Sequence, residues 1–311
     1  MIGTLATPAL YRGISRLAAP AIGLWLAHRR RQGKEDSARF AERLGHAGCA
    51  RPEGRLAWAH GASVGEALAV LPLAERLVAE GSHVLITSGT ATSANILAKR
   101  LGSGMTHQYV PIDRPAAVRR FLDHWRPDMA IWVESELWPN LVLATAARAI
   151  PMVMVNGRMS ERSARRWRSM PRLIAPLLGA FSAILAQSEA DAKRLQALGA
   201  ARVSLGGNIK YDAPPLPVDE TALELLDSAI GARPHWLAAS THPGDEAAAA
   251  QAHAALAGNI PGLLTLIAPR HPGRTAEIAD MLRLRGITQA IRSRGDAITA
   301  ETQIYIADTL G

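Results

Sequence analysis

Cysteine is nearly absent from this sequence, with Cys49 alone among 311 residues. One cysteine forms no intramolecular disulfide and no cysteine-rich metal site, which is typical of a reducing compartment. Aromatic residues are also few, with three Phe and four Tyr. Because single-strand binders stack bases on aromatic side chains, this scarcity argues against nucleic acid as a partner.

Common metal and nucleotide motifs are missing as well. The ten histidines show no HExxH or similar ligand spacing, so the sequence predicts no metal and no other cofactor. No GxGxxG and no P-loop lysine motif occurs, which argues against NAD and Walker-type nucleotides. His60 and His107 are expected to end apolar strands as core residues.

The apolar stretch near the N-terminus is too short to span a bilayer. Residues 17–27 give about eleven apolar residues, where a transmembrane helix needs roughly twenty, and arginines stand on both sides of them. We expect residues 1–50 to form a membrane-associating segment and lead-in helix. A helix in the interface would place Trp25 among the headgroups and the arginines on anionic phosphates. An ordinary core helix is the alternative.

The chain carries a net positive charge. Lys and Arg exceed Asp and Glu by 35 − 27 = +8, and the sequence pI is about 10.3. Such a balance favours anionic partners, including phosphorylated metabolites or an acidic membrane face. Hydrophobic residues make up 48% of the chain and the mean hydropathy is near zero, which is typical of a globular protein.

From Gly54 onward, short apolar runs alternate with segments of helical period. Strands that are apolar throughout predict a parallel sheet covered on both faces, and the succession predicts an α/β, doubly wound domain. The predicted strands are 56–60, 83–87, 129–134, 152–156, 183–187 and 203–206. The predicted helices between them are 66–79, 93–101, 116–124, 137–147, 161–177 and 189–198.

A proline-dense stretch, residues 213–217, then predicts a linker between two domains. We expect one domain over residues 51–212 and a second, incomplete one over residues 213–311. In the second, helices are predicted over 221–230, 244–256 and 274–285, and three strands over 236–240, 263–268 and 303–307. Two such domains would form a cleft at the carboxyl ends of their sheets, where ligands bind.

The first chemical candidate is the segment Ser63-Val64-Gly65-Glu66, which follows the first strand and opens a helix. Gly65 would let the backbone turn beside a ligand, and Glu66 in the first helical turn is favoured as an ionised carboxylate, able to accept a proton. The same pattern is also a capping box, with Ser63 as N-cap and Glu66 reaching back to it.

The second candidate ends the strand predicted over residues 129–134. Glu134 is an ionisable residue at the end of an apolar strand, where burial without a partner is costly. Glu134 and Glu136 would form a carboxylate arrangement with Glu66. Glu136 alternatively caps the helix that begins at Trp138-Pro139.

Two further loops follow strands of the second domain. Ser240 and Thr241 stand where a strand meets a helix and predict an anion cradle, with a plain Ser/Thr N-cap as the alternative. Arg270 and Arg274 follow the next strand and are suited to binding a phosphate by paired N–H donors.

Before the linker, Gly206 and Gly207 permit close approach of the backbone to a ligand or to the other domain, and Lys210 offers a point charge. The alternative is a hinge turn with a solvated lysine.

Seven motifs stand in the order and approximate spacing of one family. They are WAHGASVGE (58–66), VESELWPN (133–140), NGRMSERS (156–163), AQSEADAKRLQALGA (186–200), GGNIKYD (206–212), AASTHPGDE (238–246) and APRHPGR (268–274). On these motifs the chain resembles the 3-deoxy-D-manno-octulosonic acid (Kdo) transferases of bacterial lipopolysaccharide synthesis. Residues 31–45 are similar to the family's segment between membrane anchor and catalytic body.

The resemblance implies a GT-B-like fold of two Rossmann-like domains and an inverting, metal-independent glycosyltransferase. CMP-Kdo would be the donor and the lipid A precursor (lipid IVA) the acceptor, at the cytoplasmic face of the inner membrane, bound peripherally or by an N-terminal anchor. Glu66 becomes the general base and Glu134 lies near the reacting sugars. Ser63, Gly65, Lys210, Ser240, Thr241 and Arg270 become substrate-binding residues.

The sequence departs from the family pattern at its C-terminal end. The family continues beyond the DTxG segment, here residues 308–311, into a glycine-rich loop and a GGHNxLEP-type motif that contributes to CMP binding. The resemblance therefore also allows a second hypothesis, a shortened, non-catalytic, membrane-associated relative that retains only acceptor binding.

Overall fold

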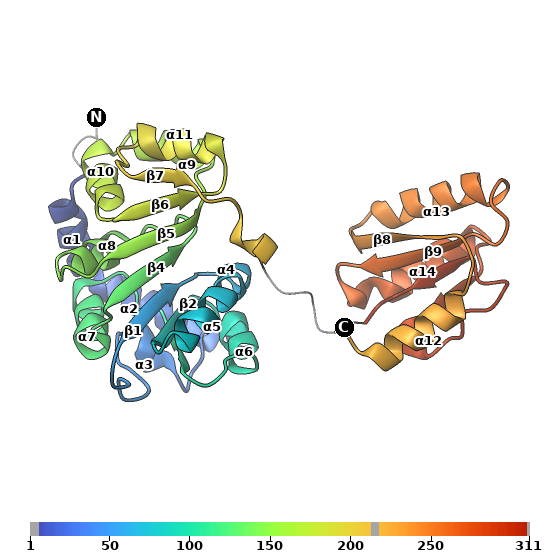
Figure 1. Ribbon diagram of the computed structural model, residues 1–311, viewed down its shortest axis with the longest axis horizontal. Coiled ribbons are helices and arrows are strands. Elements are labelled where there is room, and N and C mark those ends of the chain that lie inside the picture. Colours follow the sequence, from blue (N-terminus) through green and yellow to red (C-terminus); the bar gives the residue numbers. More distant parts are fainter. Residues whose placement is uncertain (1–5, 213–217, 310–311) are drawn as a thin grey trace. The chain divides into compact units, whose positions relative to one another are not determined.

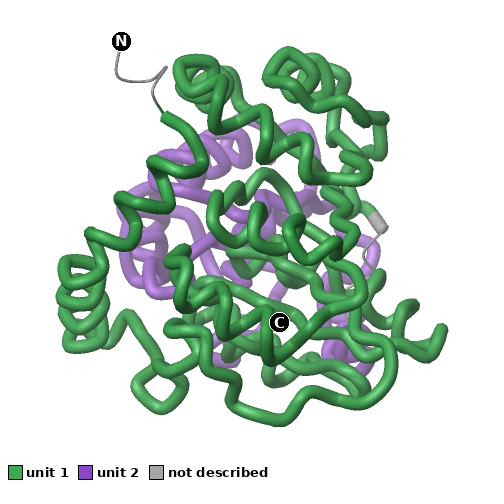
Figure 2. Tube along the Cα trace, turned by 90° about the vertical axis from the view of Figure 1, so that its left-hand side faces the viewer, with its two compact units in different colours: residues 1–214 green, residues 215–311 purple. Residues whose placement is uncertain are grey.

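The computed structural model describes residues 6–212 and 218–309 (Figure 1). The chain divides into two compact units, unit 1 over residues 1–214 and unit 2 over residues 215–311 (Figure 2). The predicted linker, residues 213–217, lies outside the described residues. The domain boundaries at residues 50 and 212 stay predictions.

Unit 1 is built on a parallel sheet that has seven strands within the described residues, in the order β3-β2-β1-β4-β5-β6-β7. The strands are β1 (Leu56–His60), β2 (His83–Ser88), β3 (Met105–Tyr109), β4 (Met129–Val133), β5 (Met152–Gly157), β6 (Ala183–Ala186) and β7 (Val203–Leu205). The six predicted strands are confirmed. Strand β3 was not predicted, because three successive polar residues in its sequence MTHQY interrupt the apolar run.

Helices cover both faces of this sheet (Figure 1). They are α1 (Pro8–Leu17), α2 (Ala19–Arg31), α3 (Phe40–Arg43), α4 (Val64–Ala69), α5 (Leu71–Ala79), α6 (Ala91–Ala98), α7 (Pro115–Trp125), α8 (Pro139–Ala146), α9 (Glu161–Arg168), α10 (Pro171–Gly179) and α11 (Glu189–Ala197), followed by the 3-10 turn η2 (Ile209–Asp212).

Alternate side chains of each central strand face opposite helix layers. Trp58 and Trp132 pack with α7, α8 and α10, whereas Ala57 and Ile131 pack with α4, α5 and α6. Because both faces are covered, each strand needs apolar residues at successive positions, which is the pattern seen in the sequence. The predicted doubly wound domain is confirmed.

Two predicted helices are each divided in the structure. The helix predicted over 66–79 breaks at Val70, and the helix predicted over 161–177 breaks at Met170. In both places a proline stands in the first turn of the second helix. Proline has no N–H and is favoured in the first turn of a helix. Here it is a stronger signal for the start of a new helix than the continuous apolar period is for a single long helix.

Unit 2 is a smaller parallel α/β unit. Its described residues form a four-stranded sheet in the order β10-β11-β9-β8. The elements are α12 (Glu220–Ile230), β8 (His235–Thr241), α13 (Asp245–Ala257), β9 (Leu264–Pro269), η3 (Pro272–Arg274), α14 (Thr275–Leu284), β10 (Gln289–Ile291), η4 (Arg292–Arg294) and β11 (Ile304–Ile306). The prediction of three strands was wrong, since β10 is a three-residue strand and shows no period in the sequence. Helices α13 and α14 cover one face and α12 the other.

Candidate functional site

The strand order of unit 1 reverses direction beside β1. Strands β2 and β3 lie on one side of β1, and β4 to β7 lie on the other. In open α/β sheets, such a reversal leaves a crevice at the carboxyl ends of the strands, and ligands bind there. The segments that leave β1 and β4 at this point carry Glu66, Glu134 and Glu136. Sheet topology therefore brings both carboxylate-bearing segments to one edge.

Glu66 is fixed by its own helix start. Ser63 is the N-cap of α4 and accepts a hydrogen bond from the Glu66 backbone N–H at 3.3 Å. The Glu66 carboxylate accepts in turn from Ser63 Oγ at 2.7 Å and from the Ala62 N–H at 2.8 Å. The capping alternative is thus confirmed. The same contacts hold a carboxylate with 8% exposure in one orientation at the sheet edge.

The tight backbone approach assigned to Gly65 belongs instead to Gly61. Gly65 lies within α4, and a Cβ there would meet only Lys210 Nζ, at 4.0 Å. A Cβ on Gly61 would lie 2.8 Å from the Ala67 backbone nitrogen, which no side chain tolerates. Glycine is therefore required where the chain folds back over the start of α4.

Glu134 adopts an unusual backbone conformation directly after β4. Its φ is +60°, a left-handed value that few non-glycine residues take. Its Oε1 accepts from Lys210 Nζ at 3.0 Å and from Asn156 Nδ2 at 3.4 Å. Asn156 is itself left-handed, with φ +55°, and is 1% exposed. Strained backbone of this kind gathers at functional sites, where the surroundings hold it in place.

Glu136 completes the carboxylate cluster. Burial raises its pKa, and the negative charges of Glu66 and Glu134 raise it further. Glu136 does not cap α8, because Asp113 does so. The Asp113 carboxylate accepts from the backbone N–H groups of Asn140 and Leu141 at 3.1 and 2.8 Å. The sequence-based alternative for Glu136 was wrong because the capping group comes from a segment 27 residues away.

A cavity of about 540 Å³ opens beside Glu134 and Glu136. Glu134 and Glu136 line it together with Arg158 and Arg166. Sequence reasoning assigned no role to these two arginines, although Arg158 lies within the NGRMSERS motif and Arg166 stands three residues beyond it. Arginine in such a cavity offers a planar set of donors to an acidic or phosphorylated ligand.

Lys210 and the glycines before it serve unit 1 itself. Lys210 pairs with Glu134 at 3.0 Å, while its side chain stays 43% exposed to solvent. A Cβ on Gly206 would lie 2.6 Å from Leu185 Cβ, and Gly207 has φ +72°. The close backbone approach predicted for Gly206 is therefore to strand β6.

In unit 2, the Thr241 hydroxyl is already engaged. It donates to Glu246 Oε1 at 2.9 Å, and the same carboxylate pairs with Arg274 Nη1 at 2.7 Å. Neither Ser240 nor Thr241 is the N-cap of α13, since Gly244 holds that position without a side-chain bond. The predicted N-cap was wrong, and Arg274 is occupied by a buried glutamate.

Ser240 and Arg270 remain available at the carboxyl edge of β8 and β9. Ser240 has φ +57° and lies at a register shift between the two strands. The Arg270 backbone N–H donates to the Thr241 carbonyl at 3.0 Å, and its side chain is exposed. The rings of His242 and His271 stand 6.0 Å apart in the two loops. The prediction that these loops are neighbours is confirmed.

Within residues 6–212 and 218–309, no group of three or more His, Cys, Asp or Glu side chains is placed to hold a metal ion. His60 is a core residue as expected. It ends β1, is fully buried, and its Nδ1 lies 3.0 Å from Thr87 Oγ1. His107 stands in the middle of β3 rather than at a strand end.

Asn156 and Gly61 are the residues that sequence reasoning missed at the first sheet edge. Each stands inside a quoted motif, Gly61 in WAHGASVGE and Asn156 in NGRMSERS. A polar residue that ends an apolar strand was the available signal for Asn156, the same signal that identified Glu134.

The family comparison covers most of unit 1. A family model described as 3-deoxy-D-manno-octulosonic-acid transferase (kdotransferase) matches residues 38–213. The probable mitochondrial 3-deoxy-D-manno-octulosonic acid transferase of Arabidopsis thaliana is 35% identical over 312 residues, 97% of this chain and 70% of that protein. The 3-deoxy-D-manno-octulosonic acid transferase of Haemophilus influenzae is 35% identical over 284 residues, 88% of this chain and 65% of that protein. The chain thus spans about two thirds of the length of both relatives.

Among solved structures, UDP-GlcNAc 2-epimerase from Neisseria meningitidis bound to UDP-GlcNAc has a TM-score of 0.56 and covers 83% of this chain and 73% of that chain. At 14% identity, this likeness concerns the fold alone. It confirms the predicted GT-B-like α/β fold class.

Proposed function

Because this chain belongs to the Kdo transferases, a family of glycosyltransferases, we propose that it transfers Kdo from CMP-Kdo to the lipid A precursor lipid IVA in lipopolysaccharide synthesis. The observation that carries the proposal is the cluster of Glu66, Glu134 and Glu136 at the point where the strand order of unit 1 reverses. A sugar transfer needs a base at the acceptor hydroxyl, and this edge supplies fixed carboxylates.

In the proposed reaction, Glu66 takes the proton of the acceptor hydroxyl while that oxygen bonds to the anomeric carbon of Kdo. The bond from that carbon to the CMP phosphate breaks, and the phosphate leaves with the electron pair. Direct displacement inverts the configuration. Glu66 is suited to this role because its carboxylate has about four acceptor sites and the protein uses two of them, through Ala62 and Ser63.

Glu134 and Glu136 are proposed to contact the sugars beside Glu66. The Lys210 ammonium and the Asn156 amide hold the Glu134 carboxylate, which gives it a fixed position in the cavity wall. Glu136 has a raised pKa and is the member of the cluster best suited to carry a proton. Arg158 and Arg166 would meet the acidic groups of a substrate in the same cavity.

Donor binding is proposed for unit 2. The CMP phosphate would meet the exposed guanidinium of Arg270 and the polar groups of Ser240 and Thr241. Donors directed at a departing phosphate stabilise the charge that develops on it. Thr241 would contribute through its backbone, since its hydroxyl donates to Glu246.

We also propose that the protein works at the cytoplasmic face of the inner membrane. No described helix is long and apolar enough to cross a bilayer. Helices α1 and α2 nevertheless expose large apolar side chains, including Leu17 at 85%, Leu24 at 74% and Trp25 at 55%. Exposed apolar residues beside arginines suit a helix that lies in the membrane interface.

Product formation tests the proposed function. The purified full chain is incubated in detergent micelles with lipid IVA and CMP-Kdo, with EDTA present, and products are identified by mass spectrometry. We expect lipid IVA carrying Kdo, and none when CMP-Kdo is omitted. Retained binding of lipid IVA with no Kdo product would overturn transfer and favour the non-catalytic, acceptor-binding alternative.

A further inference from the structure

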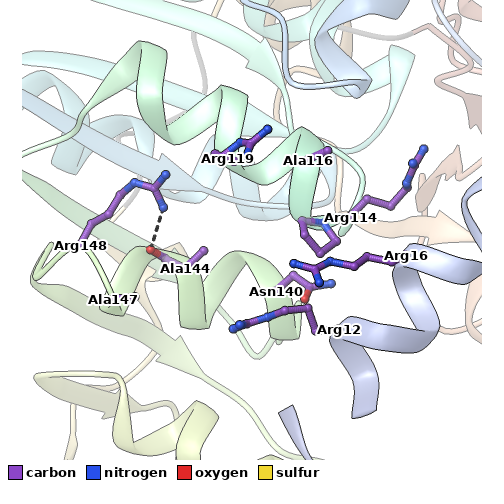
Figure 3. A pocket seen from close by; sticks show the side chains of 10 residues that line it. Arg12, Arg16, Arg114, Ala116, Arg119, Asn140, Ala144, Ala147 and Arg148 are labelled. Carbon is purple, nitrogen blue, oxygen red and sulfur yellow. Dashed lines mark hydrogen bonds between the residues drawn. The ribbon is translucent and has the colours of Figure 1, made fainter. Parts of the chain in front are cut away.

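Five arginines line a pocket on unit 1 that shares no residue with the cavity beside Glu134 and Glu136. The pocket has a volume of about 430 Å³ and lies among α1, α7 and α8 (Figure 3). Its arginines are Arg12, Arg16, Arg114, Arg119 and Arg148. No Asp or Glu is among its lining residues.

Among the described residues, most of this positive charge has no protein counterion. Arg148 pairs with Asp123 at 2.5 Å and donates to the Ala144 carbonyl at 3.2 Å. Arg12, Arg16, Arg114 and Arg119 make no ion pair with any residue that the structure describes. Guanidinium groups gathered around one pocket repel one another, so an anion that enters it relieves this repulsion.

Helix α7 adds to the attraction for an anion. Arg114 is its N-cap, Pro115 and Ala116 begin it, and all three line the pocket. The first turn of α7 holds no acidic residue, and no side chain caps it. The positive end of the helix dipole therefore adds to the field of the arginines.

The pocket is built on a fixed floor. Asn140 is 5% exposed, and its Nδ2 donates to Ser15 Oγ at 3.0 Å and to the Asp113 carbonyl at 2.7 Å. These bonds tie α1 to the start of α8. Ala116, Ala144 and Ala147 supply only small side chains and leave the space open. In Figure 3, Arg12 and Arg16 extend from α1 towards Asn140, and Arg148 stands at the other end of α8.

The same α1 helix exposes an apolar stripe. Leu10, Ile14 and Leu17 are 46%, 56% and 85% exposed and follow one another at helical spacing. Arg12 and Arg16, four residues apart, share a second stripe of the helix. A helix with apolar residues on one side and arginines on the opposite side suits the boundary of a bilayer, where its arginines can meet phosphate groups.

We propose that the pocket binds the phosphate group of an anionic membrane phospholipid. Arginine forks match the oxygens of a phosphate in pairs, so this chemistry is more specific than attraction to a charged surface. The inference rests on the membrane association proposed above and is independent of the reaction at Glu66.

Vesicle binding by the full chain tests the proposal. Vesicles of phosphatidylcholine with phosphatidic acid are compared with vesicles of phosphatidylcholine with oleate, whose anion is a carboxylate, at equal surface charge. Three double variants each remove two charges: R12Q/R16Q on α1, R114Q/R119Q at α7, and the control R100Q/R202Q on exposed surface of unit 1 outside the pocket. Circular dichroism confirms that each variant is folded.

We expect wild type to prefer phosphatidic acid over oleate by tenfold or more. Both pocket variants should lose that preference, each weakening binding to phosphatidic acid by on the order of tenfold, because each charge near the surface contributes to it. The control should keep the preference. The α7 pair is decisive, since those arginines lie on a different helix from the apolar stripe.

Four results would overturn the proposal. Equal binding of wild type to both vesicles, or equal behaviour of R114Q/R119Q and the control, would show that membrane association uses charge without a phosphate pocket. Thermal stabilisation by inorganic phosphate that both pocket variants lose, without a preference for phosphatidic acid, would assign the pocket to a soluble phosphate. Absence of wild-type binding to any vesicle would overturn membrane association as well, whereas Kdo transfer would still stand on its own assay.

Discussion

Units 1 and 2 are both parallel α/β units, but they differ in the size of the apolar side chains that they bury. The four largest fully buried side chains, Trp58, Trp125, Trp132 and Phe121, all lie in unit 1. In unit 2, the outer strand β8 leaves Leu237 57% exposed. Burial of apolar surface is the main source of folding stability, so we expect unit 1 to be the more stable unit. The two units also differ in how their polar side chains are bound.

In unit 1, hydrogen bonds from other side chains hold the carboxylates of Glu66 and Glu134 at the sheet edge. Glu66 is bound by Ser63, and Glu134 by Asn156 and Lys210. In unit 2, the buried Glu246 engages Arg274 and leaves Arg270 exposed. A rigid edge suits a catalytic base, and an exposed guanidinium suits a diffusible phosphate ligand.

The largest expected difference concerns core burial. Trp132 is fully buried, and its ring lies 4.9 Å from that of Trp58. Trp132→Ala should lower the free energy of unfolding by about 3–5 kcal/mol, whereas Leu237→Ala in unit 2 should change it by about 0.5 kcal/mol or less. Urea unfolding and hydrogen exchange, followed in each unit, measure this. Equal losses from the two substitutions would break the comparison.

The second-largest expected effect is the destabilisation of unit 1 by acid. Burial lowers the pKa of His60 to about 4, and burial with the nearby Arg39 charge lowers the pKa of His107 to about 3. The unfolded histidines, with pKa near 6.5, bind more protons in this range, so stability is full above about pH 6.5 and falls as the pH drops towards 4. His60 alone should contribute about 3 kcal/mol of this loss at pH 4.

His60→Gln tests that contribution. Its free energy of unfolding should fall less between pH 7 and pH 4 than that of wild type, since Gln does not titrate. His253→Gln in unit 2 is the comparison, because burial and the charge of Arg233 also lower the pKa of His253, so this substitution should act in the same direction. An unchanged pH dependence in His60→Gln would show that other groups drive acid unfolding.

The sequence predicted the strands of unit 1 well because their signal is local. The predicted strands that became β1, β2, β4, β5 and β6 are short, mainly apolar runs, and burial on both faces requires that pattern. Strand β3 was missed since MTHQY lacks such a run, and β10 since three residues carry no period. The position of Glu66 and Glu134 at the carboxyl edge of the sheet could be predicted because each follows a buried strand.

Partners that are distant in sequence were beyond prediction. Asp113 caps α8 from a separate segment, and Glu246 engages Arg274 from 28 residues away. Nothing in the local pattern around Glu136 or Arg274 indicates these contacts. The arginine pocket likewise forms only when α1 packs against α7 and α8, although each arginine is visible in the sequence.

The two arginines that follow β9 should separate ligand binding from stability. Arg270→Gln should weaken CMP binding by roughly ten- to a hundredfold, since hydrogen bonds to a charged group contribute about 1.5–3 kcal/mol. It should leave the melting temperature nearly unchanged. Arg274→Gln should lower the melting temperature, because Glu246 is 2% exposed and would lose its counterion. Calorimetric titration and thermal melting measure both. If Arg274→Gln lost CMP binding and Arg270→Gln did not, the roles given to these two arginines would be reversed.

The smallest expected effect concerns the ion pair at the edge of unit 1. Lys210 and Glu134 are 3.0 Å apart, but their side chains are 43% and 19% exposed. Solvent screens such a pair, so Lys210→Met should reduce stability by at most about 1 kcal/mol. Lys193→Met, at an exposed lysine of α11, is the matched control. A much larger loss would mean that Lys210 is a principal support of the edge.

The central claim, that Glu66 is the catalytic base, is tested most directly by the single-turnover rate of Glu66→Gln at saturating CMP-Kdo and lipid IVA. Glu75→Gln, at an exposed glutamate of α5, is the charge-matched control, and thermal melting separates loss of the cap from loss of the base. We predict a rate at least about 100-fold below wild type for Glu66→Gln, with CMP affinity unchanged and Glu75→Gln at the wild-type rate. A folded Glu66→Gln variant that turns over within about twofold of wild type would contradict the claim and leave Glu66 as a helix cap alone.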